Sequence, residues 1–264
     1  MNPKNDYNKA ATALITGASS GIGAELARVF AKHGHNLVLT ARRKNRLEEL
    51  AESLRRDYGI KAEVLPMDLS LESGPDDIYK NLKQKNIRID ILVNNAGLLV
   101  YGRFSQTSWE RERKLIQVNT VALSRLIKLF VPDMIERGYG RVLNIGSTGS
   151  FIPSPLNTVY SASKSFVLSL SEAASEELRG TGVTMTAVCP GATRTGLQEK
   201  AGEENVLYVK IGVMHTAKVA EYAYRKTMAG KRVAIPGFFP KLQIHFTKLL
   251  PRFIRVKLAG FALK

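Results

Sequence analysis

Short runs of apolar, β-branched residues alternate along this chain with longer segments of helical periodicity, and this alternation constrains the fold more than any other feature. The runs predict seven strands, at residues 11–16, 36–40, 62–67, 89–95, 140–147, 183–190 and 232–236. Strands that are apolar on both sides are typical of parallel sheets covered by helices on both faces. With right-handed crossovers, the sequence predicts a single-domain α/β fold with a doubly wound (Rossmann) parallel sheet.

Length and composition agree with one large domain, because the chain has 264 residues of which 44% are apolar. Cys189 is its only cysteine, and neither a secretory signal nor a run of 18 apolar residues is found in it. We therefore expect a cytoplasmic protein without a membrane-spanning helix. The four histidines are not spaced as metal ligands, so we expect no metal site.

The charge of the chain is unevenly distributed. Its formal net charge is +16, and Glu221 is the last acidic residue. Ten basic residues follow: Arg225, Lys226, Lys231, Arg232, Lys241, Lys248, Arg252, Arg255, Lys257 and Lys264. Such a segment attracts polyanions or an anionic membrane. Nucleic acid is not expected as a partner, because no zinc-finger spacing or RNA-binding aromatic motif accompanies the charge.

Residues 240–264 are amphipathic as well as basic, since Leu242, Phe246, Leu249 and Leu250 share one helical face. Two interpretations stay open. A basic amphipathic helix can lie on an anionic membrane. It can also form a flap over a cleft or against a partner subunit, and we favour the flap.

A glycine-rich turn, Thr16-Gly17-Ala18-Ser19-Ser20-Gly21-Ile22-Gly23, joins the first predicted strand to the helix after it. Glycines permit a tight turn and let a phosphate approach backbone N–H groups, and the helix N-terminus adds positive potential. The turn therefore favours a nucleotide site, although a plain tight turn has the same appearance.

Tyr160 and Lys164 are four residues apart at the start of a helix predicted over 161–179. Residues at this spacing share a helical face. A free phenol has a pKa of about 10 and is a poor base at neutral pH, whereas a nearby ammonium favours the phenolate. The pair alone is more often an ordinary solvated pair. Here Ser147 ends a predicted strand on the side of the sheet where ligands bind, which favours an acid–base site.

With "NNAG" (94–97) and "PGATRT" (190–195), these motifs make the chain resemble the short-chain dehydrogenase/reductase family over roughly residues 10–236. The resemblance implies an NAD(P)-dependent oxidoreductase that interconverts a carbonyl compound and an alcohol by hydride transfer. A non-catalytic NADP-binding scaffold or a membrane-associated regulator is the alternative. Residues 1–239 would form the dinucleotide-binding catalytic domain, and 240–264 a basic amphipathic extension.

The resemblance also assigns four catalytic residues, Asn119, Ser147, Tyr160 and Lys164. Tyr160 would donate a proton to the carbonyl oxygen, and Ser147 would hold that oxygen by a second hydrogen bond. Lys164 would lower the pKa of Tyr160 and bind the nicotinamide ribose. Asn119 would position a water that links Lys164 to solvent.

The cofactor is expected to be NADP(H) in preference to NAD(H). In doubly wound folds an acid at the end of the second strand binds the ribose of NAD, but this chain has Thr40-Ala41-Arg42-Arg43 there. Two guanidinium groups suit a 2′-phosphate, with Arg42 the favoured ligand and Arg43 a candidate to stack on adenine. The alternative is that both arginines are merely solvated and nucleotide choice is loose.

The remaining cofactor contacts come from the resemblance. Asp68 would bind the adenine amino group, Thr195 would bond the nicotinamide carboxamide, and Asn95 would be structural. The full expected set is Gly17, Ser19, Ser20, Gly21, Ile22, Gly23, Arg42, Arg43, Asp68, Leu69, Asn94, Ala96, Gly97, Tyr160, Lys164, Pro190, Gly191, Thr193 and Thr195.

The substrate is less constrained. Residues 193–214 are expected to form a lid, and a mostly apolar pocket suits a ketone, aldehyde, steroid or acyl chain. Its candidate lining could equally be core: Leu98, Val100, Tyr101, Phe104, Phe151, Leu197 and Tyr208. Family members usually form dimers or tetramers through the helices near 109–137 and 160–179, so a homo-oligomer is expected.

Overall fold

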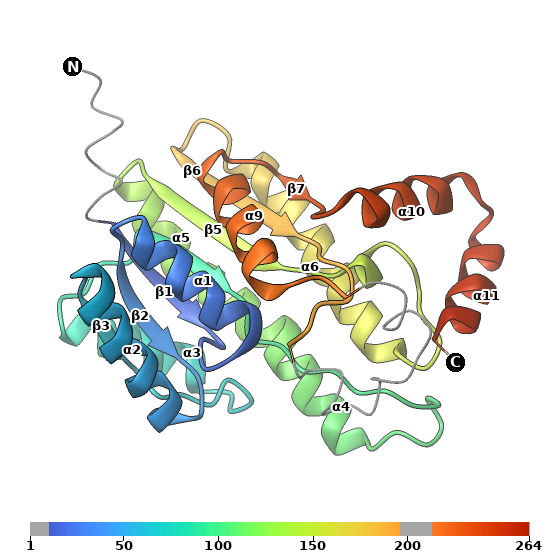
Figure 1. The fold of residues 1–264 in the computed structure, drawn as a ribbon, viewed down its shortest axis with the longest axis horizontal. Helices are drawn as coiled ribbons and strands as arrows, with labels where there is room; N and C mark the ends of the chain where they lie inside the picture. The colour runs from blue at the N-terminus through green and yellow to red at the C-terminus, as the bar shows by residue number, and fades with distance from the viewer. Residues whose placement is uncertain (1–10, 196–212, 264) are drawn as a thin grey trace.

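The protein, described from a computed structural model that covers residues 11–195 and 213–263, is built on one seven-stranded sheet (Figure 1). The strand order is β3-β2-β1-β4-β5-β6-β7, and every neighbouring pair is parallel. The strands are β1 (Thr12–Thr16), β2 (Asn36–Thr40), β3 (Ala62–Val64), β4 (Ile91–Asn94), β5 (Gly140–Ile145), β6 (Val183–Val188) and β7 (Val233–Ala234). The predicted doubly wound sheet is confirmed, and all seven strands lie within their predicted ranges.

Helices cover both faces of the sheet, as the apolar strands require. One face packs against α1 (Gly21–Lys32), α2 (Lys44–Tyr58) and α9 (Thr216–Met228). The other packs against α3 (Gly74–Gln84), α5 (Leu123–Glu136) and α6 (Thr158–Glu177). Neighbouring residues of β1 serve opposite faces, since Leu14 belongs to the α5 side and Ile15 to the α1 side. The chain order reverses between β2 and β4, on either side of β1, and ligands bind at such a switch point.

Two predicted boundaries, those of β3 and α6, differ from the structure by three residues. β3 ends at Val64 rather than at residue 67, and Pro66 lies beyond its end. Leu65 and Met67 still donate backbone hydrogen bonds to the carbonyls of Leu39 and Ala41. α6 begins at Thr158, three residues earlier than the prediction, so both Tyr160 and Lys164 lie inside the helix.

The long helix predicted over 109–137 is interrupted. α4 (Trp109–Ile116) passes into a π-helical turn (Gln117–Ala122) and then into α5. The whole segment Trp109–Glu136 has the length and composition of a membrane span, although the sequence contains no run of 18 apolar residues. However, 50% of its most apolar window is buried inside the fold, which is typical of a core helix.

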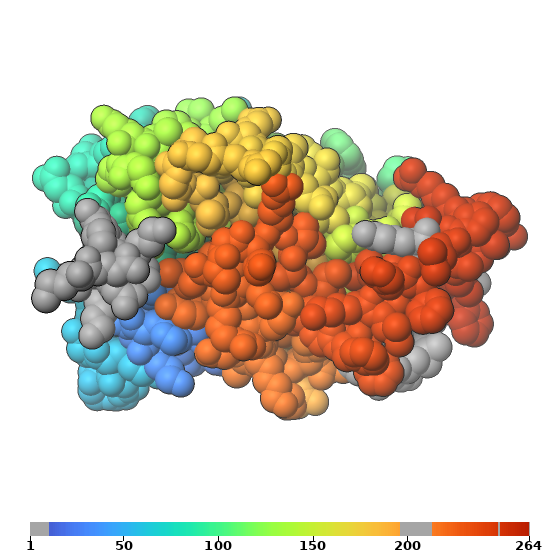
Figure 2. Space-filling model, turned by 90° about the horizontal axis from the view of Figure 1, so that it is seen from above, coloured from blue at the N-terminus to red at the C-terminus, as the bar shows by residue number. Residues whose placement is uncertain are grey.

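Two further helices follow the sheet at one end of the molecule, α10 (Phe238–Leu249) and α11 (Arg252–Ala262). Figures 1 and 2 show both, in red, beyond β7 and α6. Pro251 separates them, because its ring cannot continue α10 while its fixed φ suits the start of α11.

Candidate active site

A cavity of about 570 Å³ lies at the carboxyl ends of the strands. Its floor is formed by the glycine turn and by the residues after β2, β4, β5 and β6. The first turns of α6 form one wall, and side chains of α10 and α11 form another. The cavity therefore lies at the switch point of the sheet, where a dinucleotide binds in doubly wound folds.

The glycine turn has the backbone shape that a phosphate site needs. Gly17 and Gly21 have φ values of +68° and +58°, a region that side chains disfavour. A Cβ at Gly23 would fall on the carbonyl oxygen of Gly17 and on the side chain of Asn95. Gly23 is thus a packing residue that lets α1 approach the turn, whereas Gly17, Gly21 and Ile22 line the cavity.

Arg43 lies over this turn. Its Nη2 donates to Ser20 Oγ at 2.8 Å and to Ser19 Oγ at 3.0 Å. Arg42 also lines the cavity, and both arginines are exposed. The two guanidinium groups therefore border the mouth of the cavity next to the end of β2.

The two asparagines of "NNAG" have different surroundings. Asn94 is buried and its Nδ2 donates to Asn144 Oδ1 on β5 at 2.9 Å, so it does not contribute to the cavity wall. Asn95 is the one that lines the cavity, and its Nδ2 donates to the carbonyl oxygen of Thr16 at 2.8 Å. Among the expected cofactor residues, Asn94 and Gly23 are the two that the structure keeps out of the cavity wall.

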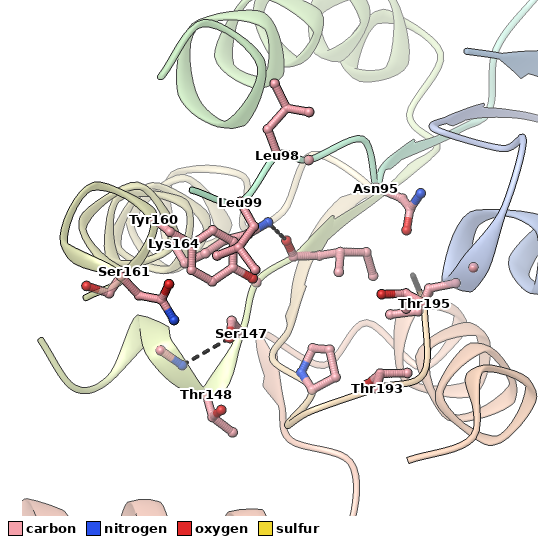
Figure 3. Close-up of a pocket in the computed structure, with 18 of the residues that line it drawn as sticks. Asn95, Leu98, Leu99, Ser147, Thr148, Tyr160, Ser161, Lys164, Thr193 and Thr195 are labelled. Carbon is pink, nitrogen blue, oxygen red and sulfur yellow. Dashed lines mark hydrogen bonds between the residues drawn. The ribbon is translucent and has the colours of Figure 1, made fainter. Parts of the chain in front are cut away.

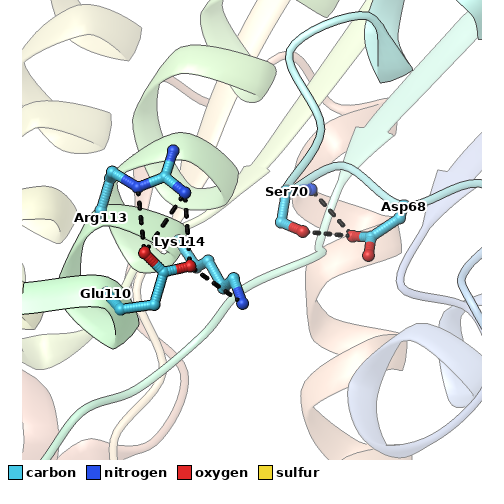
Figure 4. Close-up of polar contacts among 5 residues, drawn as sticks. All are labelled: Asp68, Ser70, Glu110, Arg113 and Lys114. Atoms are coloured by element: carbon cyan, nitrogen blue, oxygen red, sulfur yellow. Dashed lines mark hydrogen bonds and ion pairs between the residues drawn. The ribbon is translucent and has the colours of Figure 1, made fainter. Parts of the chain in front are cut away.

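Asp68 lies in the cavity wall after β3, where its Oδ1 accepts from Ser70 N at 2.9 Å and from Ser70 Oγ at 2.8 Å (Figure 4). These two bonds fix the carboxylate, and both are accepted by Oδ1 rather than by Oδ2. The neighbouring Leu69 lines the same wall, as do Ala96 and Gly97 from the segment after β4.

Tyr160 and Lys164 face the cavity from α6 (Figure 3). Lys164 Nζ lies 5.8 Å from the centroid of the Tyr160 ring and donates to the carbonyl oxygen of Ile145 at 2.8 Å. The lysine is only 5% exposed, and burial lowers the pKa of its ammonium to about 8. A buried lysine close to a phenol is typical of an acid–base pair.

Ser147 completes this group from the end of β5. It caps the short helical turn Thr148–Ser150, where its Oγ accepts from Gly149 N at 3.1 Å. A hydroxyl that accepts from a backbone N–H keeps its own hydrogen for donation. Ser147 and Tyr160 both line the cavity, and Figure 3 shows the two side chains in the same close-up.

Asn119 lies behind this group, in the π-helical turn, and is 1% exposed. Its Oδ1 accepts from Leu98 N at 2.8 Å, and its Nδ2 donates to Leu98 O and to Ser163 Oγ, both at 3.0 Å. A Cβ at Gly97 would lie 3.5 Å from Asn119 Oδ1 and 3.6 Å from Lys164 Nζ. The asparagine therefore joins the segment after β4 to α6 next to the lysine.

The segment after β6 closes the opposite side. Pro190, Gly191, Thr193 and Thr195 line the cavity, and Thr193 pairs with Met214 in an isolated parallel bridge. A Cβ at Gly21 would lie 3.1 Å from Thr195 Cβ, so this threonine lies next to the first turn of α1. Most of the predicted lid, residues 196–212, lies outside the described residues.

The apolar pocket differs from its predicted lining. Leu98 does line the cavity, but Phe104 is exposed, and Val100, Tyr101 and Phe151 lie outside the cavity wall. Leu197 and Tyr208 fall among the residues that the structure does not describe. The apolar lining that the sequence did not reveal is Leu99, Ile152, Ile244, Leu258 and Leu263. Tyr101 instead donates to Leu263 O at 2.6 Å, which holds the end of α11 over the site.

Within residues 11–195 and 213–263, no group of three or more His, Cys, Asp or Glu side chains is arranged to hold a metal ion. Ser147, Tyr160 and Lys164 line the cavity together with the glycine turn. A doubly wound sheet with this site at its switch point defines a dinucleotide-dependent oxidoreductase.

The family follows from comparison with known proteins. The family model for short chain dehydrogenase matches residues 11–206. A short-chain dehydrogenase from Sphingobium yanoikuyae, solved in complex with NADPH, is 38% identical with a TM-score of 0.81, and the match covers 90% of this chain and 94% of that one. The chain belongs to the short-chain dehydrogenase family, as its motifs indicated.

Two further relatives show the same relationship. A bulky-bulky ketone specific alcohol dehydrogenase from Comamonas testosteroni is 34% identical with a TM-score of 0.77, covering 91% of this chain and 94% of that chain. The ketoacyl reductase HetN from Nostoc sp. is 32% identical over 85% of this chain and 77% of its own length. The protein is thus an oxidoreductase that acts on alcohol or ketone groups.

Proposed function

We propose that this oxidoreductase prefers NADP(H) and acts on an apolar carbonyl compound or the corresponding alcohol. The observation that carries the cofactor preference is the pair Arg42 and Arg43 at the cavity mouth, with Ser19 and Ser20 hydrogen bonded to Arg43. Among the described lining residues, Asp68 is the only carboxylate, and it follows β3 rather than β2. A 2′-phosphate would meet two cations there, with no fixed acid at the end of β2 to repel it.

The residues present fit such a dinucleotide. Gly17 and Gly21 give the turn its positive φ values, and the first residues of α1, Gly21 and Ile22, line the cavity, so the positive end of the helix lies beside it. Asp68 and Leu69 would hold the adenine end, while Tyr160, Lys164 and Thr195 would hold the nicotinamide end. Bound NADPH supplies the hydride, which the side chains of the site cannot provide.

Side chains of the protein would then donate the proton and stabilise the negative charge that develops on the substrate oxygen. Tyr160 would donate its phenolic proton to the substrate oxygen during reduction, and Ser147 would donate a second hydrogen bond to that oxygen. Lys164, held by Ile145 O, places a positive charge beside the phenol and favours its phenolate form after transfer. Oxidation of an alcohol uses the same contacts in reverse.

The proposed substrate class rests on the lining of the cavity. Leu98, Leu99, Ile152, Ile244 and Leu258 line the same cavity as Ser147 and Tyr160. Binding a hydrocarbon against such an apolar wall is favourable because apolar surface is removed from water. The wall offers few hydrogen-bond partners for a polar substrate. The similarity to an enzyme described as specific for bulky-bulky ketones agrees with that class.

The experiment is to follow nicotinamide absorbance with NADPH and with NADH over a panel of ketones and aldehydes of increasing apolar size. We expect turnover of at least one apolar ketone, with kcat/KM for NADPH at least about tenfold above that for NADH. Equal use of both nucleotides contradicts the cofactor preference. Turnover confined to small polar carbonyls contradicts the substrate class, and no turnover with any compound favours a non-catalytic scaffold.

We also propose that the protein forms a homo-oligomer through α4, α5 and α6. Exposed apolar side chains lie on these helices and on the π-helical turn between α4 and α5, at Trp109, Val121, Ile135 and Phe166. Exposed apolar patches of this kind are typical of subunit contacts. Analytical ultracentrifugation of the wild type and of Phe166→Glu tests this, and a monomeric wild type contradicts it.

A further inference from the structure

The helix α10 presents two different faces. Toward the cavity it places Ile244, which is 2% exposed, together with Gln243 and Thr247. Away from the cavity it places large apolar side chains in water: Phe238, Phe239, Leu242, Phe246 and Leu249. Since positions 238, 242, 246 and 249 recur at intervals of four and three residues, these side chains form one continuous stripe.

If α10 served only as a flap, its large apolar side chains would be buried against the cleft, but the side chains of this stripe are exposed. Phe246 is 62% exposed, Leu249 79% and Phe239 80%. The cavity is already closed on this side by the opposite face of the same helix, so the exposed stripe does not contribute to its wall. Contiguous apolar surface of this kind marks a contact with a partner or a membrane.

The helix α11 extends the same arrangement. It turns Ala259, Ala262 and Leu263 toward the cavity, and leaves Phe253 and Phe261 exposed. Lys257 is exposed between these two phenylalanines in the sequence. Figures 1 and 2 place α10 and α11 at the same end of the molecule.

The charge near this surface indicates its occupant. The chain has no acidic residue after Glu221, and Lys241, Arg252 and Lys257 are exposed on the two helices. A second copy joined by a two-fold axis would bring this acid-free surface against itself, so that like charges would meet. A surface that combines apolar side chains with cations and lacks acids is instead complementary to anionic lipid.

We propose that the outward faces of α10 and α11 dock on a membrane that carries anionic lipids. The aromatic and aliphatic side chains enter the boundary between headgroups and acyl chains, while the lysines and arginines contact the headgroups. The inward faces keep their place in the cavity wall. The two interpretations of the extension, a flap and a membrane helix, therefore apply to opposite sides of the same helices.

The test is co-sedimentation of the full chain with vesicles of phosphatidylcholine alone or of phosphatidylcholine with phosphatidylglycerol. We expect the wild type to pellet with the anionic vesicles and to remain in solution with the neutral ones. The double variant Phe246→Ser/Leu249→Ser should bind the anionic vesicles at least about tenfold more weakly, because two exposed apolar side chains are lost. Leu71→Ser is the matched control, since Leu71 is 58% exposed between β3 and α3 and its loss should leave binding unchanged.

A charge-reversal variant tests the contribution of the basic side chains separately from that of the apolar ones. Lys257→Glu should weaken binding to anionic vesicles by about fivefold or more, whereas Lys61→Glu, a reversal at an exposed lysine before β3, should weaken it less. Equal binding to both kinds of vesicle, or full binding by both variants, overturns the proposal. Absence of vesicle binding by the wild type also overturns the proposal. If the wild type does not bind vesicles and Phe246→Ser/Leu249→Ser sediments with a smaller mass than the wild type, the occupant is a second copy. Each readout is independent of turnover, so the proposal can fail while the proposed function stands.

Discussion

The ammonium of Lys164 donates a 2.8 Å hydrogen bond to the carbonyl oxygen of Ile145, which joins the first turns of α6 to the last residue of β5. This bond holds a buried cation beside the Tyr160 ring. Since Ser147 follows β5 by two residues, the same strand end positions both partners of the phenol. The geometry of the site thus depends on one lysine that burial itself disfavours.

Replacing that lysine by an apolar residue of similar length should stabilise the fold. Burial lowers the pKa of Lys164 to about 8 from its ordinary 10.5, so the charged form destabilises the folded state. Lys164→Met should raise the free energy of unfolding at pH 7 by about 1–3 kcal/mol, with the lost bond to Ile145 O reducing the gain. Urea unfolding at pH 7 measures the difference, and Lys61→Met, at an exposed position, should change it by less than about 0.5 kcal/mol.

The same variant has a defined pH dependence. Because the folded pKa is lowered, the destabilisation is fully present below about pH 8 and declines as pH rises from 8 toward 10.5, where the unfolded lysine also loses its proton. The stability advantage of Lys164→Met over the wild type should therefore shrink between pH 8 and pH 10. A variant that is less stable at pH 7, or an advantage that does not change with pH, contradicts this account.

Removing the arginines at the cavity mouth should change nucleotide choice. If Arg42 and Arg43 bind a 2′-phosphate, each contributes a charge-assisted hydrogen bond, and Arg42→Ala/Arg43→Ala should raise KM for NADPH about 10- to 100-fold while leaving KM for NADH within about threefold. Steady-state kinetics with both nucleotides measures this. Arg46→Ala is the matched control, because Arg46 is exposed one turn further along α2. A parallel rise for both nucleotides would mean that the arginines act on the turn rather than on the phosphate.

The contact between α1 and the glycine turn gives a prediction about stability. A methyl group at Gly23 would overlap Gly17 O and the Asn95 side chain, so Gly23→Ala should destabilise the fold by about 2 kcal/mol or more and weaken nucleotide binding. Gly59→Ala is the comparison, since Gly59 has a φ of +65° with nothing near its Cβ position and should cost only about 1 kcal/mol of backbone strain. Urea unfolding and nucleotide titration measure both. Equal destabilisation by the two changes would show that the close approach at Gly23 is unimportant.

The sheet, its topology and the clustering of Ser147, Tyr160 and Lys164 could be predicted because each depends on local pattern and on strand ends. The distinction between Asn94 and Asn95 could not be predicted in the same way. β4 is buried on both faces, so alternation does not reveal which asparagine turns toward the cavity. Only the pairing of Asn94 with Asn144 on the neighbouring strand decides it.

Other features depend on contacts between distant parts of the chain. His35, between α1 and β2, is fully buried, and its Nε2 lies 3.1 Å from the Tyr224 hydroxyl. Burial lowers the pKa of His35 to about 4. The apolar lining from Ile244, Leu258 and Leu263 also escaped prediction. Their helical periodicity shows a face but does not show which surface covers it.

The most direct test of the account is Tyr160→Phe, which removes one hydroxyl and leaves the ring beside Lys164. With NADPH affinity measured separately by titration, the single-turnover rate of ketone reduction should fall about 10²- to 10⁴-fold while nucleotide affinity changes by less than about threefold. That result would establish the phenol as the proton donor of the site. A variant that binds the nucleotide normally and keeps most of its rate would contradict the assignment.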